Sequence, residues 1–257
     1  MTSNHAPVPL DRDRISQIMH GRLALQNPVS PAKLDALVDL VALEPADRLL
    51  DVGCGRGELL VRLSERTGAG GVGVDVSPVA IEDARVRARE RVPDAPLELV
   101  CGDARRVLPE GPFGLAACVG SSHALGGLPA TLAALAVRVR PGGWMLVGEG
   151  FWRIEPSSGY LRALGGATRD ELPDLAGLLA AGAPHGLRPV GLRVASDDDW
   201  DAYEWTLIAN GDSYATEHPD QPGVDELRAW VQEARERCSR PDGRATLGFA
   251  LVLLRRD

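Results

Sequence analysis

The chain has 257 residues, of which 44% are hydrophobic and 25% charged, and its mean hydropathy is −0.08. This composition is typical of a globular protein with a full core, and the length favours one large domain or a domain with a sizeable insertion. Its 28 Lys and Arg are outnumbered by 36 Asp and Glu, so the net charge of −8 argues against a nucleic acid as partner.

Targeting and redox features are sparse. No stretch approaches the roughly 18 consecutive apolar residues of a membrane span, and the start, MTSNHAPVPLDRDR, lacks the apolar core of a secretory signal. We therefore expect a cytoplasmic protein without a membrane partner. We also expect reduced thiols and no metal site, because the cysteines form no CxxC pair: Cys54, Cys101, Cys118 and Cys238.

Predicted elements alternate between helix and strand from residue 31 onward. Ser30 and Pro31 are typical of a helix start, and residues 47–53 predict a short buried strand that runs into glycines. Helices are predicted at residues 57–66, 77–91 and 128–140. Further strands are predicted at residues 70–77, 96–103, 114–120 and 143–150. This alternation favours βαβ units and a mostly parallel sheet covered on both faces.

The last third of the sequence changes character. It predicts a helix at 173–183, a strand at 187–196 and a final strand at 244–256. Residues 197–243, between those two strands, are rich in Trp, Tyr and acidic residues and too long for a turn. We therefore expect a helical insertion there that acts as a lid, within a domain of residues 46–257. Residues 1–45 are expected to form an N-terminal helical cap.

A glycine loop, DVGCGRGE, lies where the first predicted strand meets a helix. A dinucleotide site favours G-x-G-x-x-G/A, with a pyrophosphate on the helix N-terminus. Here the third glycine, Gly57, comes four residues after Gly53 and is followed by Glu58. Asp51 and Glu58 bracket the loop and would repel a pyrophosphate, whereas a ligand with an amine and a sulfonium would be attracted. The pattern argues against a nicotinamide dinucleotide.

Two further carboxylates follow the next predicted strands. Asp75 lies 22 residues after Gly53, close to the spacing at which an acidic residue binds ribose hydroxyls, and Asp103 ends the third strand. The carboxyl ends of adjacent parallel strands face one crevice, where such sheets bind ligands. Local roles are the alternative, because Asp75 can form a turn beside Ser77 and Asp103 can cap a helix.

These segments resemble the motifs of class I S-adenosylmethionine-dependent methyltransferases. LLDVGCGRG resembles their first motif, GVGVDVS the second and VCGDA the third. The resemblance is close over roughly residues 45–152 and loose through the last two strands. It implies nothing specific about residues 1–30 and 197–243. It implies a Rossmann-like α/β fold, with a mostly parallel seven-stranded sheet whose last strand is reversed, helices on both faces, and helical additions at the N-terminus and between the last two strands.

The resemblance also implies S-adenosylmethionine as cofactor. Asp51 would lie near its methionine amine, and Asp75 would bind both ribose hydroxyls. Asp103 would accept a hydrogen bond from the adenine amine, and Ala104 would offer its backbone amide. Three glycines would let the backbone approach the cofactor: Gly53, Gly55 and Gly57. Three neighbours are expected to line the same site: Cys54, Val76 and Gly120.

Methyl transfer from a sulfonium is an in-line displacement, so a base is needed only where the acceptor carries a proton. The loop after the fourth strand contains His123, the one group there that titrates near neutral pH, and we predict it as general base. A loop histidine satisfied by backbone is the alternative. The loop lacks the Asn-Pro-Pro-Tyr type of motif found in many amino-group methylases of DNA and proteins, which argues for a different acceptor.

Several residues suit an acceptor pocket, although each can instead be core or surface: His20, Glu149, Trp152, Trp200 and Tyr203. Asp197–Asp199 predict dipole-favourable capping of a helix rather than a metal cluster. Arg85, Arg87, Arg89 and Arg91 divide between opposite faces of a helix and predict a solvated surface.

The sequence thus predicts an enzyme that methylates a small-molecule acceptor with S-adenosylmethionine, with no metal and no nucleic-acid partner. Two alternatives stay open. One is a protein that binds S-adenosylmethionine or S-adenosylhomocysteine without catalysis. The other, less favoured by the glycine loop, is an NAD(P)-dependent oxidoreductase.

Overall fold

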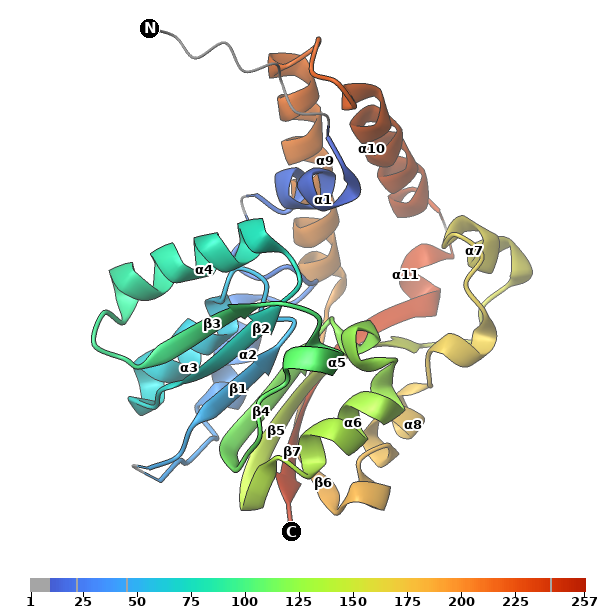
Figure 1. Cartoon of the computed structure of the whole chain (residues 1–257). Coiled ribbons are helices and arrows are strands. Elements are labelled where there is room, and N and C mark those ends of the chain that lie inside the picture. The colour runs from blue at the N-terminus through green and yellow to red at the C-terminus, as the bar shows by residue number, and fades with distance from the viewer. Residues whose placement is uncertain (1–9, 22, 45, 241) are drawn as a thin grey trace, which may run out of the picture.

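A seven-stranded sheet forms the centre of the computed structural model, which describes residues 10–21, 23–44, 46–240 and 242–257 (Figure 1). Its strand order is β3-β2-β1-β4-β5-β7-β6. The strands are β1 (Leu49–Val52), β2 (Gly71–Asp75), β3 (Leu97–Cys101), β4 (Phe113–Val119), β5 (Val139–Trp152), β6 (Leu187–Val194) and β7 (Leu247–Arg256).

The first five strands pair in parallel, and β7 runs antiparallel to both of its neighbours, β5 and β6. The predicted mostly parallel sheet with a reversed last strand is therefore confirmed. The central strand β1 is buried along its whole length, as expected where helices cover both faces. Its register places Asp51 between Gly73 of β2 and Ala117 of β4.

Helices cover the two faces of the sheet in separate layers. On one face α2 (Pro31–Val38) and α3 (Glu58–Thr67) contribute to an apolar cluster with Leu49, Leu146 and Leu251. On the other face α6 (Leu128–Ala136) and α8 (Leu175–Ala180) pack on β5. α4 (Pro78–Arg91) packs on β2, β3 and α3, and the short α5 (Ala104–Val107) follows β3.

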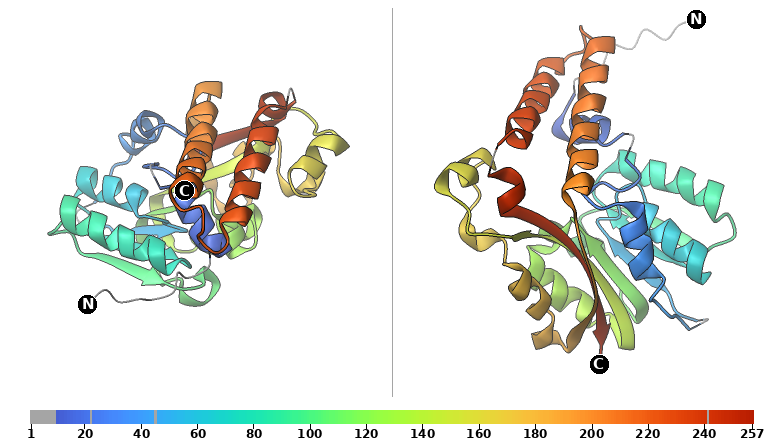
Figure 2. Two further views of the ribbon diagram at one scale, coloured as in Figure 1. Left: turned by 90° about the horizontal axis from the view of Figure 1, so that it is seen from above. Right: turned by 180° about the vertical axis from the view of Figure 1, so that it is seen from behind.

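A group of three helices stands above the carboxyl edge of the sheet (Figures 1 and 2). It consists of α1 (Arg12–Met19), α9 (Asp197–Glu217) and α10 (Val224–Cys238), and we call it the helical cap. The cap has an apolar cluster of its own, in which Ile15 and Leu227 are fully buried. The insertion predicted between the last two strands is thus helical. None of the helices in the described part of the chain has the length and apolar character needed to span a membrane.

Three elements differ from the sequence-based prediction. β5 begins at Val139, within the segment expected to be helical, and runs to Trp152. It is long because β4 pairs with one of its edges and β7 with the other. The segment after β5 contains α7 (Ser158–Ala163), which the sequence did not predict, and α11 (Gly243–Thr246) precedes β7.

Candidate cofactor-binding site

The glycine loop occupies the turn between β1 and α3, at the carboxyl edge of the sheet. Gly53, Gly55 and Gly57 have φ angles of 68°, 51° and 73°, in the left-handed region that favours glycine. At Gly53 a Cβ atom would lie 2.2 Å from the Cβ of Ser121, which follows β4. The loop therefore needs glycine both for its backbone conformation and for the close approach of Ser121.

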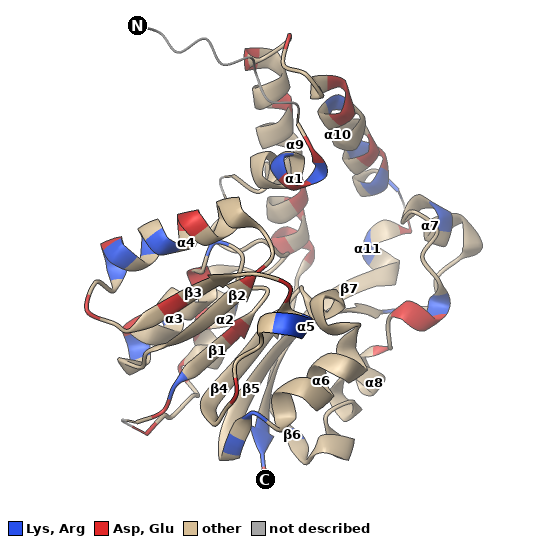
Figure 3. Cartoon of the chain, viewed as in Figure 1, with Lys and Arg blue, Asp and Glu red and all other residues tan. Residues whose placement is uncertain are grey.

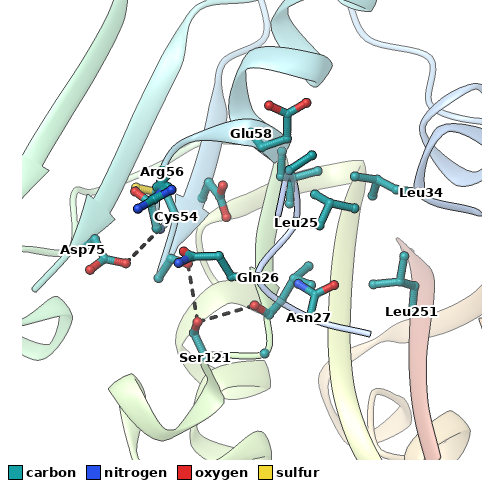
Figure 4. A pocket seen from close by; sticks show the side chains of 17 residues that line it. Leu25, Gln26, Asn27, Leu34, Cys54, Arg56, Glu58, Asp75, Ser121 and Leu251 are labelled. Carbon is teal, nitrogen blue, oxygen red and sulfur yellow. Dashed lines mark hydrogen bonds between the residues drawn. The ribbon is translucent and has the colours of Figure 1, made fainter. Parts of the chain in front are cut away.

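Beside this loop lies a cavity of about 120 Å³, which we call the inner chamber (Figure 4). Its walls are the glycine loop, Asp51, Ser121 and Leu251, and the segment of residues 24–27 between α1 and α2 closes it. Figure 4 shows the side chain of Gln26 between the glycine loop and Ser121, and that of Asn27 on the side of Leu251. The inner chamber is thus formed by parts of the chain that are far apart in sequence.

Two buried acceptor oxygens in the inner chamber lack a hydrogen-bond donor among the described residues. They are Oδ2 of Asp51 and Oδ1 of Asn27. Burial, and secondly the charge of Asp75, raise the pKa of Asp51 to about 7. An ammonium group supplies both a positive charge and several donors, so these residues fit the methionine amine of the expected cofactor.

Asp75 ties the glycine loop to the turn that follows β2. Its Oδ2 accepts the backbone N–H of Gly55 at 2.8 Å, and its Oδ1 accepts that of Ser77 at 2.9 Å. Each carboxylate oxygen can accept a second hydrogen bond. Asp75 thus holds the loop in shape and has capacity left for ligand hydroxyls.

A second cavity, of about 320 Å³, shares Gly53, Asp75 and Ser121 with the first. We call it the outer chamber. Its further walls include Val76, Asp103, Ala104 and His123. Val76 is 72% exposed, an unusual state for valine, and it presents an apolar surface that suits a nucleobase. The two chambers together, joined at Asp75, match a ligand with an amino-acid end, a ribose and a base.

Asp103 has the local role that the sequence left as an alternative. It caps α5 by accepting the N–H of Arg105 at 3.0 Å, and it also pairs with the Arg105 guanidinium. Hydrogen bonds from the Arg105 side chain and backbone lower the pKa of Asp103. Asp103 also lines the outer chamber.

Arg56 of the glycine loop clamps the N-terminal helix over the inner chamber. It donates hydrogen bonds to Gln17 and to the carbonyl of Gly21, at 3.1–3.3 Å. Asn210 of α9 donates to the carbonyl of Met19 at 2.8 Å from the other side. We call α1 and residues 24–27 the roof of the site.

His20 connects the roof to α9. Its Nδ1 lies 2.8 Å from the carbonyl oxygen of Ser16, which can only accept, so Nδ1 carries a proton. Burial lowers the pKa of His20, so the ring is neutral and Nε2 accepts a hydrogen bond from the Tyr203 hydroxyl at 2.9 Å. Neither residue lines the inner or outer chamber.

Glu58 corrects one electrostatic argument from the sequence. It is 6% exposed, and its carboxylate pairs with Arg62 at 2.6 Å, Arg91 at 2.7 Å and Arg87 at 3.2 Å. Three guanidinium groups compensate its charge, so Glu58 does not repel an anion at the loop. The expectation that Arg87 and Arg91 only form a solvated surface is also wrong, because they hold this carboxylate.

Four other sequence predictions are placed as follows. His123, exposed in the outer chamber, lies with Val76 and Asp103 and does not reach the inner chamber. Trp152 is 7% exposed and donates to the carbonyl of Arg169, within an apolar cluster beneath α7. Neither Glu149 nor Trp200 lines these two chambers.

The acidic run at the start of α9 has a capping role. Asp199 and Ser196 form a capping box, and Asp199 pairs with Lys33. Within the described ranges no group of His, Cys, Asp and Glu could hold a metal ion.

Sequence reasoning missed four polar residues of the inner chamber: Gln26, Asn27, Arg56 and Ser121. Arg56 and Ser121 lie inside or beside segments that were singled out, so their neighbourhood was a usable signal. Gln26 and Asn27 belong to no motif and reach the site only because α1 docks on α9.

Comparisons with known proteins agree with this geometry. A protein-family model described as a methyltransferase domain matches residues 49–143. An S-adenosylmethionine-dependent methyltransferase from Geobacter sulfurreducens, solved with S-adenosyl-L-homocysteine, is 30% identical, with a TM-score of 0.87 over 97% of this chain and 99% of that one.

Two curated relatives are also similar. The uncharacterized protein YjhP of Escherichia coli is 29% identical over 89% of this chain and 92% of its own length. Nocamycin O-methyltransferase of Saccharothrix syringae is 36% identical over 42% of this chain and 39% of its own length. On fold, glycine loop and full-length similarity, the chain belongs to the S-adenosylmethionine-dependent methyltransferases.

Proposed function

We propose that this methyltransferase acts on a small-molecule acceptor. The observation that carries the proposal is the roof, which covers the inner chamber with residues 24–27 and is fastened to the glycine loop by Arg56. Such a cover restricts access to the cofactor's methyl group, which a small acceptor can still reach, whereas a polymer needs an open surface. The similarity to nocamycin O-methyltransferase supports the same acceptor class.

The charge distribution supports this choice. Figure 3 shows basic residues interspersed with acidic ones along α4 and α10, and two exposed arginines, Arg105 and Arg106, on α5 beside the site. Two arginines of α4, Arg87 and Arg91, hold the buried Glu58. Binding a nucleic acid requires many phosphate contacts, and two arginines on α5, both paired with Asp103, are few against a net charge of −8, so we infer that a nucleic acid is not the acceptor.

We assign the inner chamber to the methionine end of the cofactor and the outer chamber to its nucleoside. Asp51 and Asn27 would hold the ammonium, and Asp75 the ribose hydroxyls. Val76, Asp103 and Ala104 would flank the base. When bound, the cofactor supplies an electrophilic methyl group on a sulfonium. The glycines of the loop let the backbone come close, and Cys54 and Gly120 complete the wall.

The protein's own contribution is orientation and exclusion of water. Asp51 holds one end of the cofactor and Asp75 its middle, which fixes the direction in which the methyl group points. The roof keeps solvent from the inner chamber, which strengthens the attraction between Asp51 and a cation. Burial also raises the pKa of the Cys54 thiol, so this neighbour stays protonated and does not compete as a nucleophile.

The role of His123 as general base remains a prediction, and its place in the outer chamber makes two roles separable. Loss of turnover in His123→Asn with unchanged cofactor affinity indicates a base. Reduced affinity with turnover retained indicates a wall of the nucleoside site. The pH dependence of kcat gives a second readout, because a base imposes a limb that the variant lacks.

Calorimetric titration with S-adenosylmethionine, S-adenosylhomocysteine and NAD tests the site assignment. We expect the first two to bind and NAD not to bind, and we expect Asp75→Ala to lose binding. Asp94→Ala is the matched control, because Asp94 is exposed and distant from both chambers. Unchanged binding in Asp75→Ala would contradict the assignment.

Release of S-adenosylhomocysteine in the presence of a panel of small hydroxy, amino and carboxylic acids tests the acceptor class. Turnover with a ribosomal or DNA substrate alone would contradict the proposal. Cofactor binding without turnover on any acceptor class would favour the non-catalytic alternative.

A further inference from the structure

A third cavity, of about 130 Å³, lies where the helical cap meets α7, α11 and the start of β7. We call it the cap chamber. Figure 1 shows α7 and α11 lower than α10, with α11 leading into the start of β7. Its walls come from α7, α9, α10, α11 and β7, and its side chains with polar atoms include Tyr160, Trp200, Tyr203, Glu204, Arg237 and Arg244. A cavity of this size takes a single aromatic ring, since an engineered cavity of about 150 Å³ binds benzene.

The polar groups of the cap chamber are mostly donors. Glu204 is 5% exposed. Its Oε2 forms an ion pair with Nη1 of Arg244 at 2.6 Å, although the donor and acceptor are not aligned for a hydrogen bond. Arg244 also pairs with the outlying Asp201 at 2.6 Å. The charge of Glu204 is therefore already compensated from within the protein.

Two donors are left over. Arg237 is about one third exposed at the rim of the chamber; its guanidinium lies 3.9 Å from Glu204 and makes no hydrogen bond to any described residue. Nε1 of Trp200 is buried and, in the described part of the chain, also lacks an acceptor. A buried donor without a partner loses free energy, and a ligand with acceptor oxygens recovers it.

A cationic ligand fits the same chamber poorly. It would compete with Arg244 for Glu204 and would lie close to the guanidinium of Arg237. The Arg244 guanidinium already lies over the Trp200 ring, 5.5 Å from its centre, where a ligand cation would otherwise bind. The chemistry of the walls thus favours an anion with a flat apolar body.

The cap chamber lies on the same face of the sheet as the inner chamber. Leu247 lines the cap chamber and Leu251 the inner chamber. Both side chains lie on the same face of β7, with Phe249 between them. Four residues of strand span about 13 Å. Trp200 belongs to the same apolar cluster as Leu251, so only packed side chains separate the two chambers.

We propose that the cap chamber binds the acidic end of the methyl acceptor, a small planar carboxylate whose ring packs between Trp200 and Tyr160 and whose carboxylate pairs with Arg237. This proposal rests on the proposed function and names its substrate class. The opposite end of such an acceptor points along β7 toward the inner chamber, and it reaches that chamber only if the packed side chains between the two, Phe249 among them, move aside. Tyr203 lines the cap chamber and is fixed by its hydrogen bond to His20.

The test uses three ring-sized probes and the whole chain saturated with S-adenosylhomocysteine. The probes are 4-fluorobenzoate, 4-fluorobenzyl alcohol and 4-fluorobenzylamine, and their dissociation constants are measured by ¹⁹F NMR. We expect the acid to bind at least tenfold more tightly than the alcohol, and the amine not to bind. Arg237→Gln should weaken the acid about tenfold and leave the alcohol unchanged.

Arg235→Gln is the matched control. Arg235 lies on the same helix, two residues earlier, and pairs with Asp212 at 3.0 Å outside the cap chamber. It should leave all three affinities unchanged.

Three results overturn the proposal: tighter binding of the amine than of the acid, an acid affinity that Arg237→Gln does not change, or binding of none of the probes. Titration of S-adenosylhomocysteine on the same samples separates the two hypotheses. If it binds and no probe does, the substrate class is wrong and the cofactor site stands. If it does not bind, the proposed function fails, and the probes are then measured on the free protein.

Discussion

Asp51 offers the sharpest test of the site, because its charge should destabilise the free protein and serve only the ligand. Burial raises its pKa from the ordinary 3.8 to about 7. A raised acid pKa means that the folded state binds the proton more tightly than the unfolded state does. Stability attributable to this group is therefore present at low pH and is lost as the pH rises from about 4 to about 7.

The magnitude follows from the two values. At pH 8 the penalty of charging Asp51 in the folded state is about 4 kcal/mol, and at pH 5 it is about 1.5 kcal/mol. Asp51→Asn removes the charge but buries an amide that needs a partner, at a cost of about 1–2 kcal/mol. We expect the variant to be about 2–3 kcal/mol more stable than the parent at pH 8, and about equally stable at pH 5.

Urea denaturation of the ligand-free protein at both pH values measures this difference. Thermal unfolding gives a second reading, with an expected Tm increase of roughly 4–12 °C at pH 8 for a chain of this size. Asp94→Asn, at an exposed position, controls for the loss of one negative charge. A variant that is less stable than the parent at pH 8, or a difference that does not depend on pH, would refute the reasoning.

The same variant should lose the cofactor. In the parent, the affinity for S-adenosylmethionine should increase about tenfold for each unit by which the pH rises toward 7, and it should level off above pH 7. The reason is that the ammonium pairs only with ionised Asp51. Asp51→Asn should bind weakly at every pH. Calorimetry from pH 5.5 to 8.5 checks this, and a flat profile in the parent would show that Asp51 does not face the ammonium.

Three further substitutions test the scaffold of the site. Gly53→Ala places a Cβ 2.2 Å from that of Ser121 at a φ of 68°, so it should destabilise the fold by about 2–4 kcal/mol and abolish cofactor binding. Adding Ser121→Gly to this variant removes the steric contact but not the backbone strain, so urea denaturation should show only a partial recovery of stability. Glu58→Gln leaves three guanidinium groups without their buried partner and should cost about 3 kcal/mol in urea denaturation, whereas the exposed Glu82→Gln should cost under 1 kcal/mol. Arg56→Ala releases the roof and should raise the stopped-flow dissociation rate of S-adenosylhomocysteine about tenfold, with Arg89→Ala unchanged.

The predicted core of the fold rests on signals that are local in sequence. β1 is four buried residues followed by glycines, and Ser77 with Pro78 begins α4 as expected, with the Ser77 hydroxyl accepting the N–H of Ala80. Such features need only neighbours along the chain, so periodicity and capping rules identify them. The glycine loop is also a local signal. Asp75 is not a neighbour of the loop along the chain, but it follows the loop at a spacing that a motif rule describes.

The parts that sequence reasoning missed depend on contacts between distant segments. Asn27 reaches the inner chamber because α1 and α9, nearly 200 residues apart, pack together through Met19 and Asn210. Glu58 was interpreted as a free charge because its partners Arg87 and Arg91 lie on another helix, one turn apart. Arg62, four residues after Glu58 on the same helix, is the one partner that spacing within a segment indicates. The contacts from Arg87 and Arg91 depend on how two helices pack.

The position of β7 in the sheet also bears on how the molecule is made. β7 lies between β5 and β6 and is, among the described residues, the strand that pairs with β6, yet it follows both in sequence, after the whole of α9 and α10. On the ribosome, β1 to β4 and the glycine loop can therefore pair while β5 and β6 still present open edges. The half of the sheet that carries the cofactor loop is complete first. The half that supports the cap chamber closes only when the last strand emerges, and until then β5 and β6 each keep an edge that β7 will later cover.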